Sequence, residues 1–571
     1  MDVLILAAGL GSRVSKYTFN IIPKFLINID DNTGLFHIIE YWEKYASNIH
    51  LVIHSSFYEI TKYYIDNVIP TEYNYKINII IYDESDGTAF TLNYILNNQL
   101  FNKIINKNLL ITWCDIYPVE NIDFKLIEDV EDVEDIKENN SNKNNNVYVF
   151  TNGNNCRYGL KNNNVVFCEN SDGNILGIFY IQNYTEFNLD NIIKGDDIVL
   201  YLDQIGKINE FKINKITDYG DEKKLNFIYN NIAEKLNNSN IKGRYFNKFT
   251  ILDNKLLKES INSKGNELIE KERAWYSFIN NNKIHPILYN NDDNNANTNI
   301  LKNSILIEFK KHYTSVYQYF DNINLRIKEN IYLKNTFDEI KNIILNNIIT
   351  KIRYLHSLNS KIVSNELFYK NLQIEIFNKI ISRKKNIGSF INYFGKINIV
   401  NGITINSFEE VLNKCKNIIY EYYDTKKDAE NNFEYRIIHG DCQFSNILMS
   451  PYNFSDIFLI DPRGYFGESI IFGPVEYDYA KILYAISGYD MFNSNYFIID
   501  NLDSNINSGD KSINFKIPEI KFNKKIMDKY FQKVHYAFVV IIWIGLADYT
   551  KNNIWKCLAS YYHGLYLGTL L

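Results

Sequence analysis

The sequence predicts an α/β chain built from two domains. The first has a mainly parallel mixed sheet with helices on both faces, and the second is a bilobal α+β domain. Up to about residue 236, short β-rich runs alternate with helical stretches, a pattern typical of a parallel sheet. A smaller β-rich block follows, and from about residue 320 the chain is largely helical. At 571 residues the chain is also too long for one core.

The first domain is expected to span residues 1–238. Its strand candidates are apolar runs rich in β-branched residues, at residues 3–8, 50–54, 77–82, 109–112 and 147–150. Between them, residues 34–45 and 88–96 have the apolar spacing of helices. The polar run at residues 237–243 (Asn-Asn-Ser-Asn-Ile-Lys-Gly) predicts a linker at the domain boundary.

The second domain is expected to span residues 243–571. Its small β lobe, at about residues 243–319, includes a hairpin formed by residues 248–253 and 255–259. The helical lobe covers about residues 320–571, apart from one strand–loop–strand. A small β lobe followed by a larger helical lobe, with a nucleotide between them, is the layout of protein-kinase-like folds.

Composition and charge narrow the class of protein. Hydrophobic residues make up 46% and charged residues 22%, as in soluble globular proteins. The 61 basic and 67 acidic residues give a net charge of −6, so nucleic acid is not an expected partner. Six scattered cysteines without a C-x-x-C pair fit a reducing compartment. We expect a cytoplasmic protein with small-molecule substrates and no membrane insertion, and self-association into a homo-oligomer stays open.

A glycine-rich loop follows the first predicted strand. Ala8-Gly9-Leu10-Gly11-Ser12-Arg13 can wrap phosphates with backbone N–H groups, and Arg13 can grip their oxygens bidentately. Lys24, behind Pro23, adds a second cation. Together with Gly87-Thr88-Ala89 and with Asp115 at the end of a strand, the loop predicts a nucleoside triphosphate site. Turn glycines, a strand cap at Asp115 and a helix N-cap at Thr88 are the structural alternatives.

Over roughly the first 235 residues this pattern resembles the sugar-phosphate nucleotidyltransferase family. The resemblance implies a Rossmann-like nucleotidyltransferase fold and a defined set of site residues. Departures are Asn170 after Glu169, where a Lys is usual, and Cys114 before Asp115, where a Gly is usual. The implied roles are triphosphate binding by Ala8, Gly9, Gly11 and Arg13, contact with the reacting phosphates by Lys24, base contact by Gly87 and Thr88, Mg²⁺ binding by Asp115 and Asp218, and acceptor binding by Gly159, Glu169 and Gly177.

A second constellation lies near the other end of the chain. His439-Gly440-Asp441 is followed by Asn446 after five residues and by Asp461 after fifteen more. Phosphoryl transfer needs a group that orients a hydroxyl nucleophile, and it needs oxygen ligands for Mg²⁺. Asp441 suits the first role, and Asn446 and Asp461 suit the second. His439 is expected to orient the loop.

From about residue 243 to 571 the chain resembles the aminoglycoside phosphotransferase and choline kinase superfamily. The resemblance implies that Lys258 holds the ATP phosphates, that Glu272 pairs with it, and that Glu308 lies on the hinge strand beside the adenine. Lys255 competes for the role of Lys258. The Asp461-Pro462-Arg463-Gly464 segment departs from choline kinases and looks more like phosphotransferase-type domains of surface-polysaccharide synthesis.

The two resemblances together imply a bifunctional transferase. The kinase-like domain would use ATP and Mg²⁺ to phosphorylate a sugar or amino sugar. The nucleotidyltransferase domain would then use UTP or CTP to form a nucleotide sugar for glycan synthesis, with release of pyrophosphate. One alternative is choline kinase with phosphocholine cytidylyltransferase. A second is a nucleotide-binding regulator with degenerate sites.

Overall fold

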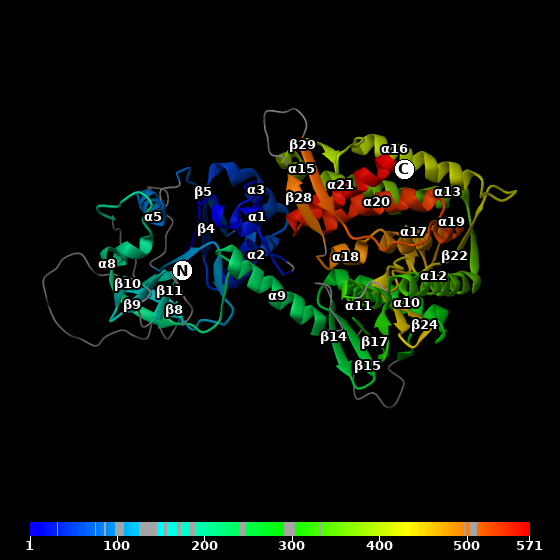
Figure 1. Ribbon diagram of the computed structural model, residues 1–571, viewed down its shortest axis with the longest axis horizontal. Helices are drawn as coiled ribbons and strands as arrows, with labels where there is room; N and C mark the ends of the chain where they lie inside the picture. Colours follow the sequence, from blue (N-terminus) through cyan, green and yellow to red (C-terminus); the bar gives the residue numbers. More distant parts are fainter. Residues whose placement is uncertain are drawn as a thin grey trace. The chain divides into compact units, whose positions relative to one another are not determined.

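The structure of the protein is a computed structural model in which the chain forms two compact units (Figure 1). Unit 1 comprises Met1–Asn238 with Asn552–Ile554, and unit 2 comprises Ser239–Lys551 with Trp555–Leu571. The structure describes residues 1–30, 32–74, 76–84, 87–97, 108–124, 146–152, 157–167, 173–182, 189–238, 247–289, 303–329, 333–495, 497–502 and 511–571.

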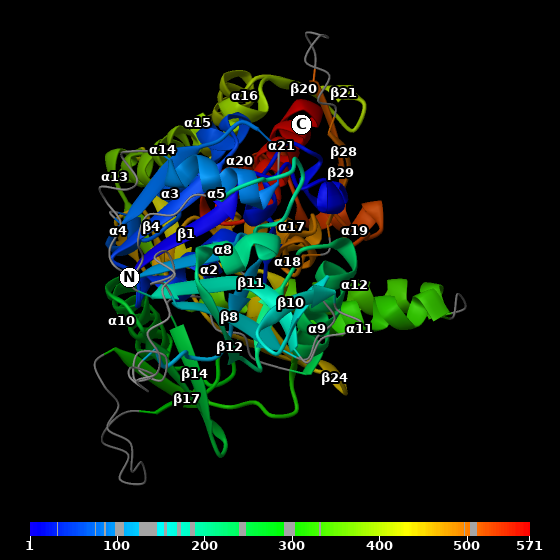
Figure 2. The same ribbon diagram turned by 90° about the vertical axis from the view of Figure 1, so that its left-hand side faces the viewer.

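Unit 1 contains a mixed sheet, nine-stranded over the described residues, with the order β10-β9-β11-β6-β1-β4-β5 and with β8 between β11 and β12. Figure 2 shows β4, β1, β11 and β8 following one another across this sheet. The central strands β5, β4, β1 and β6 are parallel, and β11 joins β6 antiparallel. The strands are β1 (Asp2–Ala7), β4 (Asn48–Ile53), β5 (Ile77–Ile81), β6 (Leu109–Trp113), β8 (Asn146–Asn152), β9 (Tyr158–Lys161), β10 (Asn164–Phe167), β11 (Gly173–Gln182) and β12 (Lys207–Lys212).

Strand β1 is an interior strand of this sheet, between β4 and β6. Every residue of β1 is buried, as expected for a central strand packed on both faces. The predicted mixed sheet with parallel central strands is therefore confirmed, and each predicted strand lies within about two residues of an observed one. The other elements are α1 (Ser15–Thr18), α2 (Gly34–Glu43), α3 (Tyr58–Asn67), α4 (Thr71–Asn74), α5 (Thr88–Leu96), α8 (Leu202–Ile205), α9 (Glu222–Asn238), β2 (Asn28–Ile29), β3 (Asn32–Thr33), β7 (Ile116–Pro118) and β13 (Ile216–Asp218).

Strand register brings the predicted site residues of unit 1 to one edge of the sheet. Leu6 of β1 lies opposite Val52 of β4 and Trp113 of β6. Because these strands are parallel, the segments that leave β1 and β6 begin at the same edge. These segments are the glycine-rich loop and Cys114-Asp115. Ligands in open α/β sheets bind at such carboxyl ends.

Unit 2 begins with a four-stranded antiparallel sheet of order β14-β15-β17-β16, with α10 packed against β15 and β17 (Figure 1). The predicted hairpin is present as β14 and β15, in which Leu252 pairs with Lys255. The elements are β14 (Asn247–Leu252), β15 (Lys255–Ser260), α10 (Ser263–Ile279), β16 (Leu288–Tyr289) and β17 (Ser304–Glu308).

Most of the remaining unit 2 is helical and packs around α20, whose apolar run 536–547 is largely buried. Helices α14, α16 and α17 all contact α20. Within the described part of the chain, no single helix is long and apolar enough to cross a membrane, although the bent pair α19–α20 meets the length and composition criteria. The helices are α11 (Val316–Glu329), α12 (Leu333–Ser357), α13 (Asn365–Leu372), α14 (Asn378–Asn386), α15 (Gly388–Phe394), α16 (Phe408–Asp424), α17 (Val475–Ile486), α18 (Tyr489–Asn493), α19 (Lys524–Tyr530), α20 (Lys533–Tyr549) and α21 (Ile554–Leu570).

The helical part of unit 2 has more β structure than the single strand–loop–strand that the sequence predicts. In one sheet β20 pairs in parallel with β29, more than a hundred residues later in the chain. Short strands with such distant partners leave little local pattern. The strands are β18 (Thr314–Ser315), β19 (Ser360–Val363), β20 (Ile397–Val400), β21 (Ile403–Thr404), β22 (Phe433–Ile437), β23 (Ile447–Ser450), β24 (Asn453–Leu459), β25 (Tyr465–Phe466), β26 (Ser469–Ile470), β27 (Phe472–Gly473), β28 (Ile498–Leu502) and β29 (Lys511–Lys516).

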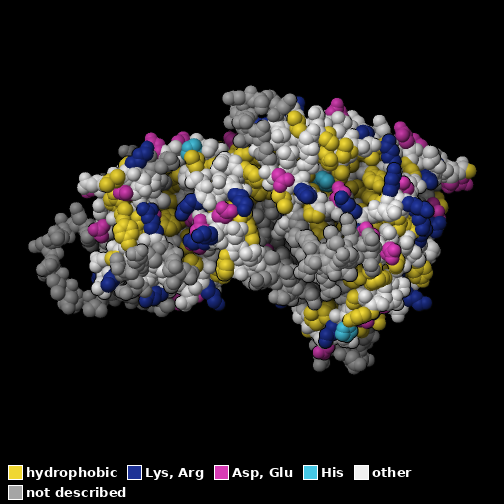
Figure 3. All heavy atoms as spheres, viewed as in Figure 1, with side chains coloured by type: hydrophobic (Ala, Val, Ile, Leu, Met, Phe, Trp, Pro, Cys, Tyr) yellow, Lys and Arg dark blue, Asp and Glu magenta, His cyan; other side chains and the backbone are white. Residues whose placement is uncertain are grey.

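Charged side chains of both signs are mixed on the face drawn in Figure 3. On the face drawn in Figure 3, Lys and Arg side chains are intermingled with Asp, Glu and hydrophobic side chains. This mixture matches the small net charge of −6.

Candidate active sites

The site in unit 1 is centred on a buried ion pair between Lys24 and Asp115. Lys24 opens a short 3₁₀ turn (Lys24–Leu26) behind Pro23, and Asp115 follows β6. Their side chains are only 12% and 10% exposed. A charged pair this buried is expensive to desolvate, so its presence at the carboxyl edge of the sheet indicates a functional site.

Asp218 lies beside Asp115. In the two-stranded ladder of β7 and β13, Asp218 pairs with Ile116, the residue next to Asp115. A Cβ added to Gly220 would lie 2.7 Å from Asp115 Oδ2 and 3.2 Å from Asp218 Oδ1, so both carboxylates flank this glycine. Lys224 Nζ donates to Asp218 Oδ2 at 2.6 Å. The structure thus brings together two carboxylates that are 103 residues apart in the chain.

The surroundings of the Lys24–Asp115 pair favour the charged forms of both side chains. Burial acts to raise the pKa of Asp115, but Lys24 and Arg13 outweigh it and hold the pKa below its usual value. Burial likewise acts to lower the pKa of Lys24, yet Asp115 raises it overall. Arg13 itself is exposed and lies close enough to act on Asp115. The site therefore holds the ionised carboxylate of Asp115 beside the cations of Lys24 and Arg13.

The carboxylates of Asp115 and Asp218 fit a Mg²⁺ ion. Each already carries a lysine ammonium, so a cation is accepted at both positions. Among the described residues, no group of three or more His, Cys, Asp or Glu side chains forms a metal cluster. Mg²⁺ is commonly bound by one or two carboxylates together with substrate phosphates and water, which matches this donor set.

The glycine-rich loop begins where β1 ends. Ala8 is buried, whereas Gly9 and Leu10 are exposed. A Cβ on Gly9 would meet no atom within 4 Å, and one on Gly11 would lie 3.2 Å from Lys24 Cβ. The loop therefore has an open side at Gly9 and is packed against the Lys24 segment at Gly11.

Gly87 and Thr88 form the start of α5. Gly87 has φ 97°, and a Cβ there would overlap the carbonyl oxygen of Asp196. The Thr88 hydroxyl donates to Asp197 Oδ1 at 2.9 Å and accepts from Ile198 N at 2.9 Å. These contacts tie α5 to the segment before α8. Thr88 therefore has a structural role in addition to the contact with the base that the resemblance implies.

We expect Gly87→Ala to affect mainly stability and Gly9→Ala to affect mainly binding of the nucleoside triphosphate. Gly87→Ala should destabilise the protein by about 1–3 kcal/mol, because alanine is strained at positive φ and collides with Asp196. Gly9→Ala should change stability by less than about 0.5 kcal/mol, yet it should raise the KM for the nucleoside triphosphate because the methyl group blocks close approach of phosphate. Urea unfolding and pyrophosphate-release kinetics of both variants measure these effects. Equal destabilisation by the two variants would contradict the assignment.

Two of the three predicted acceptor residues can be located. Gly159 lies in β9 opposite Val166 and Asn174, and Gly177 lies in β11 at φ 75°. A side chain at Gly177 would overlap the ring of Trp113, at the end of β6. Glu169 lies outside the described residues.

In unit 2, Lys258 is the centre of a buried charge cluster. Lys258 of β15 donates to Glu272 Oε2 of α10 at 2.6 Å and also pairs with Asp461, after β24. The Lys258 and Glu272 side chains are only 7% and 6% exposed. The carboxylates outweigh the effect of burial and raise the pKa of Lys258. Lys255, the competing candidate, instead lies over the Tyr289 ring.

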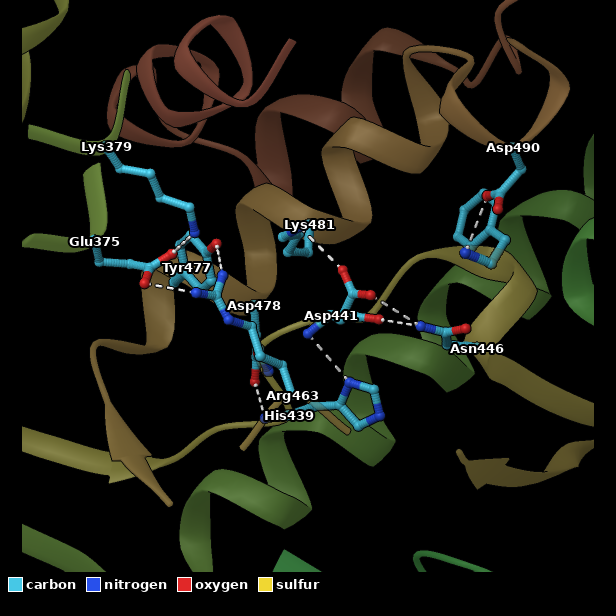
Figure 4. Close-up of polar contacts among 12 residues, drawn as sticks. Glu375, Lys379, His439, Asp441, Asn446, Arg463, Tyr477, Asp478, Lys481 and Asp490 are labelled. Carbon is cyan, nitrogen blue, oxygen red and sulfur yellow. Dashed lines mark hydrogen bonds and ion pairs between the residues drawn. The ribbon is translucent and has the colours of Figure 1, made fainter. Parts of the chain in front are cut away.

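Asp441 lies on a loop between β22 and β23 whose conformation is fixed by hydrogen bonds (Figure 4). His439 Nε2 bonds the Ile460 carbonyl at 3.0 Å, and its Nδ1 accepts from Asp441 N at 3.3 Å. Burial lowers the pKa of His439 and so favours the neutral ring, and the two hydrogen bonds place its proton on Nε2. These contacts agree with the expected orienting role of His439.

Two buried carboxylates anchor this loop, and the sequence did not reveal either role. Asp478 of α17 accepts from His439 N at 2.9 Å, from Gly440 N at 2.7 Å and from His356 Nε2 at 3.0 Å. Asp490 of α18 accepts from the backbone N–H groups that follow Gln443, at 3.1 and 3.3 Å. Burial raises the pKa of Asp490 to about 7. Asp478, in the first turn of α17, therefore fixes the backbone of this loop.

Asp441 is held from both sides. Lys481 Nζ of α17 donates to Asp441 Oδ1 at 3.0 Å, and Asn446 Nδ2 donates to Oδ2 at 3.2 Å. In Figure 4 the Asn446 amide oxygen points away from Asp441. Although burial acts to lower the pKa of Lys481, Asp441 raises it overall. Lys481 is 40 residues from Asp441 in the chain, so only the structure shows that they are partners.

Asn446 and Asp461 fit a second Mg²⁺ site by the chemistry of their donors. Asp461 already neutralises the Lys258 ammonium, and its backbone has φ 54°, with its N–H donated to Tyr276 Oη at 3.2 Å. Ile460 N donates to the Asn446 carbonyl at 3.0 Å, which ties the two segments together. An amide oxygen and a carboxylate are hard ligands suited to Mg²⁺.

Unit 2 contains a cavity of about 280 Å³ that several of these charged groups line. One part of the cavity is lined by Lys258, Glu272, Asp441 and Asp461. The other part, beyond Asp441, is lined by side chains of α17, of α20 and of the segment before α14. Glu308, the predicted hinge residue, lies at the end of β17, pairs with Lys310 at 2.8 Å and is not among the lining residues.

The N-terminal part of the chain is similar to several solved structures. No protein-family model matches the chain, and no curated protein matches it. Similar solved structures cover the N-terminal part. They include a protein described as a glucose-1-phosphate thymidylyltransferase from Bacillus anthracis, solved with sucrose (15% identity, 43% of this chain and 98% of that chain, TM-score 0.31). Others are HddC from Yersinia pseudotuberculosis (22%, 41% and 99%, TM-score 0.30) and a nucleoside-diphosphate-sugar pyrophosphorylase from Vibrio cholerae RC9 (14%, 40% and 100%, TM-score 0.31).

Proposed function

We propose that unit 2 is a small-molecule kinase that transfers the γ-phosphoryl group of ATP to a hydroxyl group. The observation that carries this proposal is that Asp441, Lys258 and Asp461 all line one cavity. Asp441 would accept the proton of the acceptor hydroxyl as its oxygen bonds to the γ-phosphorus. The bond from the γ-phosphorus to the bridging oxygen breaks, and ADP leaves. Lys258 would hold the phosphates while Glu272 fixes its position.

Unit 1 would use the product in a second transfer. A phosphate oxygen of the sugar phosphate attacks the α-phosphorus of UTP or CTP, the bond to the bridging oxygen breaks, and pyrophosphate leaves. Lys24 and Arg13 would neutralise charge on the phosphates, and the glycine-rich loop would cradle them. The buried Lys24–Asp115 pair beside Asp218 supports this proposal.

Both reactions use phosphate chemistry for which Mg²⁺ is suited. Asp115 and Asp218 would hold the ion in unit 1, and Asn446 and Asp461 would hold it in unit 2. When bound, the ion neutralises charge on the phosphate oxygens. The product, a nucleotide sugar, would serve glycan assembly.

A reconstitution with the purified protein tests the order of the reactions. With a free sugar and UTP or CTP, pyrophosphate should appear only when ATP is added. With the matching sugar 1-phosphate, it should appear without ATP. ADP, pyrophosphate and the nucleotide sugar are measured by coupled assay and mass spectrometry. Binding of nucleotide without any turnover across a broad panel of acceptors would instead support the regulator with degenerate sites.

A further inference from the structure

Part of the cavity beyond Asp441 is built by one helical face. Glu375, Lys379 and Arg383 are spaced four residues apart on the π-helix (Gln373–Phe377) and the adjoining α14, and all three line the cavity. Residues at this spacing share one side of a helix. Single π-helical turns are frequent at functional sites. The segment therefore directs a row of charged side chains into the cavity.

The one carboxylate in this row is fully engaged. Glu375 Oε1 accepts from Lys379 Nζ at 2.8 Å, and Oε2 accepts from Arg463 Nη2 at 2.6 Å (Figure 4). The Glu375 side chain is 5% exposed. Both oxygens are thus occupied, and Glu375 offers little to a cationic ligand.

Arg383 differs from its neighbours because it forms no ion pair with a carboxylate of the described residues. Its Nη1 donates to the Gly545 carbonyl of α20 at 2.9 Å. Gly545 allows this approach, since a Cβ there would lie 3.3 Å from the guanidinium nitrogen. A guanidinium held by a neutral carbonyl keeps its full charge and further donors for a ligand.

The wall around the acceptor side of Asp441 carries excess positive charge. Arg383, Arg463 and Lys481 are cations, and Lys379 joins them when it is protonated, against the carboxylates of Glu375 and Asp441. Burial lowers the pKa of Lys379 to about 7, and Arg463 and Arg383 add to this effect while Glu375 opposes it. Crowded cations of this kind are stabilised when an anion binds between them.

We propose that the acceptor of the kinase site carries an anionic group, a carboxylate or a phosphate, which binds at Lys379 and Arg383 while its hydroxyl faces Asp441. This inference rests on the proposed kinase function and names its substrate class. The rest of the wall suits a small organic body, because it includes tyrosine rings and apolar side chains (Tyr477, Tyr484, Tyr489, Ile541 and Leu546). A quaternary ammonium such as choline would meet like charges here, which disfavours choline as the acceptor.

The test measures binding to the full chain by calorimetry, with Mg²⁺ and a non-hydrolysable ATP analogue present. The probes are glucuronate, glucose 6-phosphate, glucose and choline. We expect at least one of the two anions to bind about 10-fold or more tightly than glucose and choline. Comparison of glucuronate with glucose 6-phosphate distinguishes a carboxylate from a phosphate acceptor.

Two variants locate the binding. Arg383→Gln should remove most of the anion preference, a loss of about 10-fold to 100-fold, because a charged hydrogen bond is lost. Lys385→Gln removes an exposed cation two residues away on the same helix and should leave the preference unchanged. Unaltered binding of the ATP analogue to both variants shows that the unit is folded.

The outcomes separate this inference from the kinase proposal. The inference is overturned if neither anion binds, if glucose or choline binds as tightly, or if Arg383→Gln retains the preference. Asp441-dependent ADP release is scored separately. Anion binding through Arg383 without ADP release supports the inference and counts against the kinase proposal. ADP release with choline or glucose, without any preference for anions, supports the kinase proposal and overturns the inference.

Discussion

Asp441→Asn should reduce acceptor-dependent ADP release by about 10²- to 10⁴-fold, the range typical for loss of a general base. Asparagine keeps the size of the side chain but cannot accept the hydroxyl proton. The change also leaves Lys481, which donates to Asp441 at 3.0 Å, without its carboxylate. Initial rates of ADP formation at saturating ATP measure the effect, and pyrophosphate release from a supplied sugar phosphate should be unchanged.

Asp500→Asn is a matched control for this variant. Asp500 is an exposed aspartate of β28 in the same unit and is not among the residues lining the cavity. The Asp500→Asn variant should release ADP at the rate of the unmodified protein. If Asp441→Asn retained more than about a tenth of the rate, Asp441 could not be the base.

Asp115→Asn is expected to reduce pyrophosphate release by about 10²- to 10³-fold, because a carboxylate beside the reacting phosphates is lost. It should also destabilise unit 1 by about 3–5 kcal/mol, since Lys24 is then left buried without its partner. Pyrophosphate release and urea unfolding measure the two effects. ADP release by unit 2 should continue.

A companion variant separates the catalytic loss from the structural loss. Asp218→Asn leaves the Lys24–Asp115 pair in place, so it should impair pyrophosphate release with a smaller loss of stability. Asp203→Asn, at an exposed position of α8, should change neither property. If Asp218→Asn were fully active, the paired-carboxylate assignment would have to be abandoned.

Short-range patterns in the sequence were sufficient for much of the fold. In unit 1 the alternating runs located the central strands, because buried parallel strands are continuous apolar segments. Asp441, Asn446 and Asp461 could be found because their spacing in one local segment is set by the chemistry. The roles of Lys258 and Glu272 were expected from the resemblance to the phosphotransferase superfamily, and the two side chains are in contact at 2.6 Å.

Other residues could not be found this way, because their partners are distant in the chain. Asp478 anchors the loop at His439 and Gly440 across 39 and 38 residues, and Arg463 reaches Glu375 across 88. A lone aspartate in a helix has no sequence signature that distinguishes a cap from a loop anchor. The β20–β29 pairing was missed for the same reason.

The sequence by itself determined the order of most elements and suggested the candidate reacting groups, because backbone periodicity and local motif spacing are properties of neighbouring residues. Only the tertiary structure decided which charges meet outside the recognised motifs. It placed Lys224 against Asp218, Lys481 against Asp441, and Lys379 and Arg383 in the cavity. Such contacts depend on how separate helices and strands pack, and electrostatic interaction depends on distance in space rather than on separation along the chain.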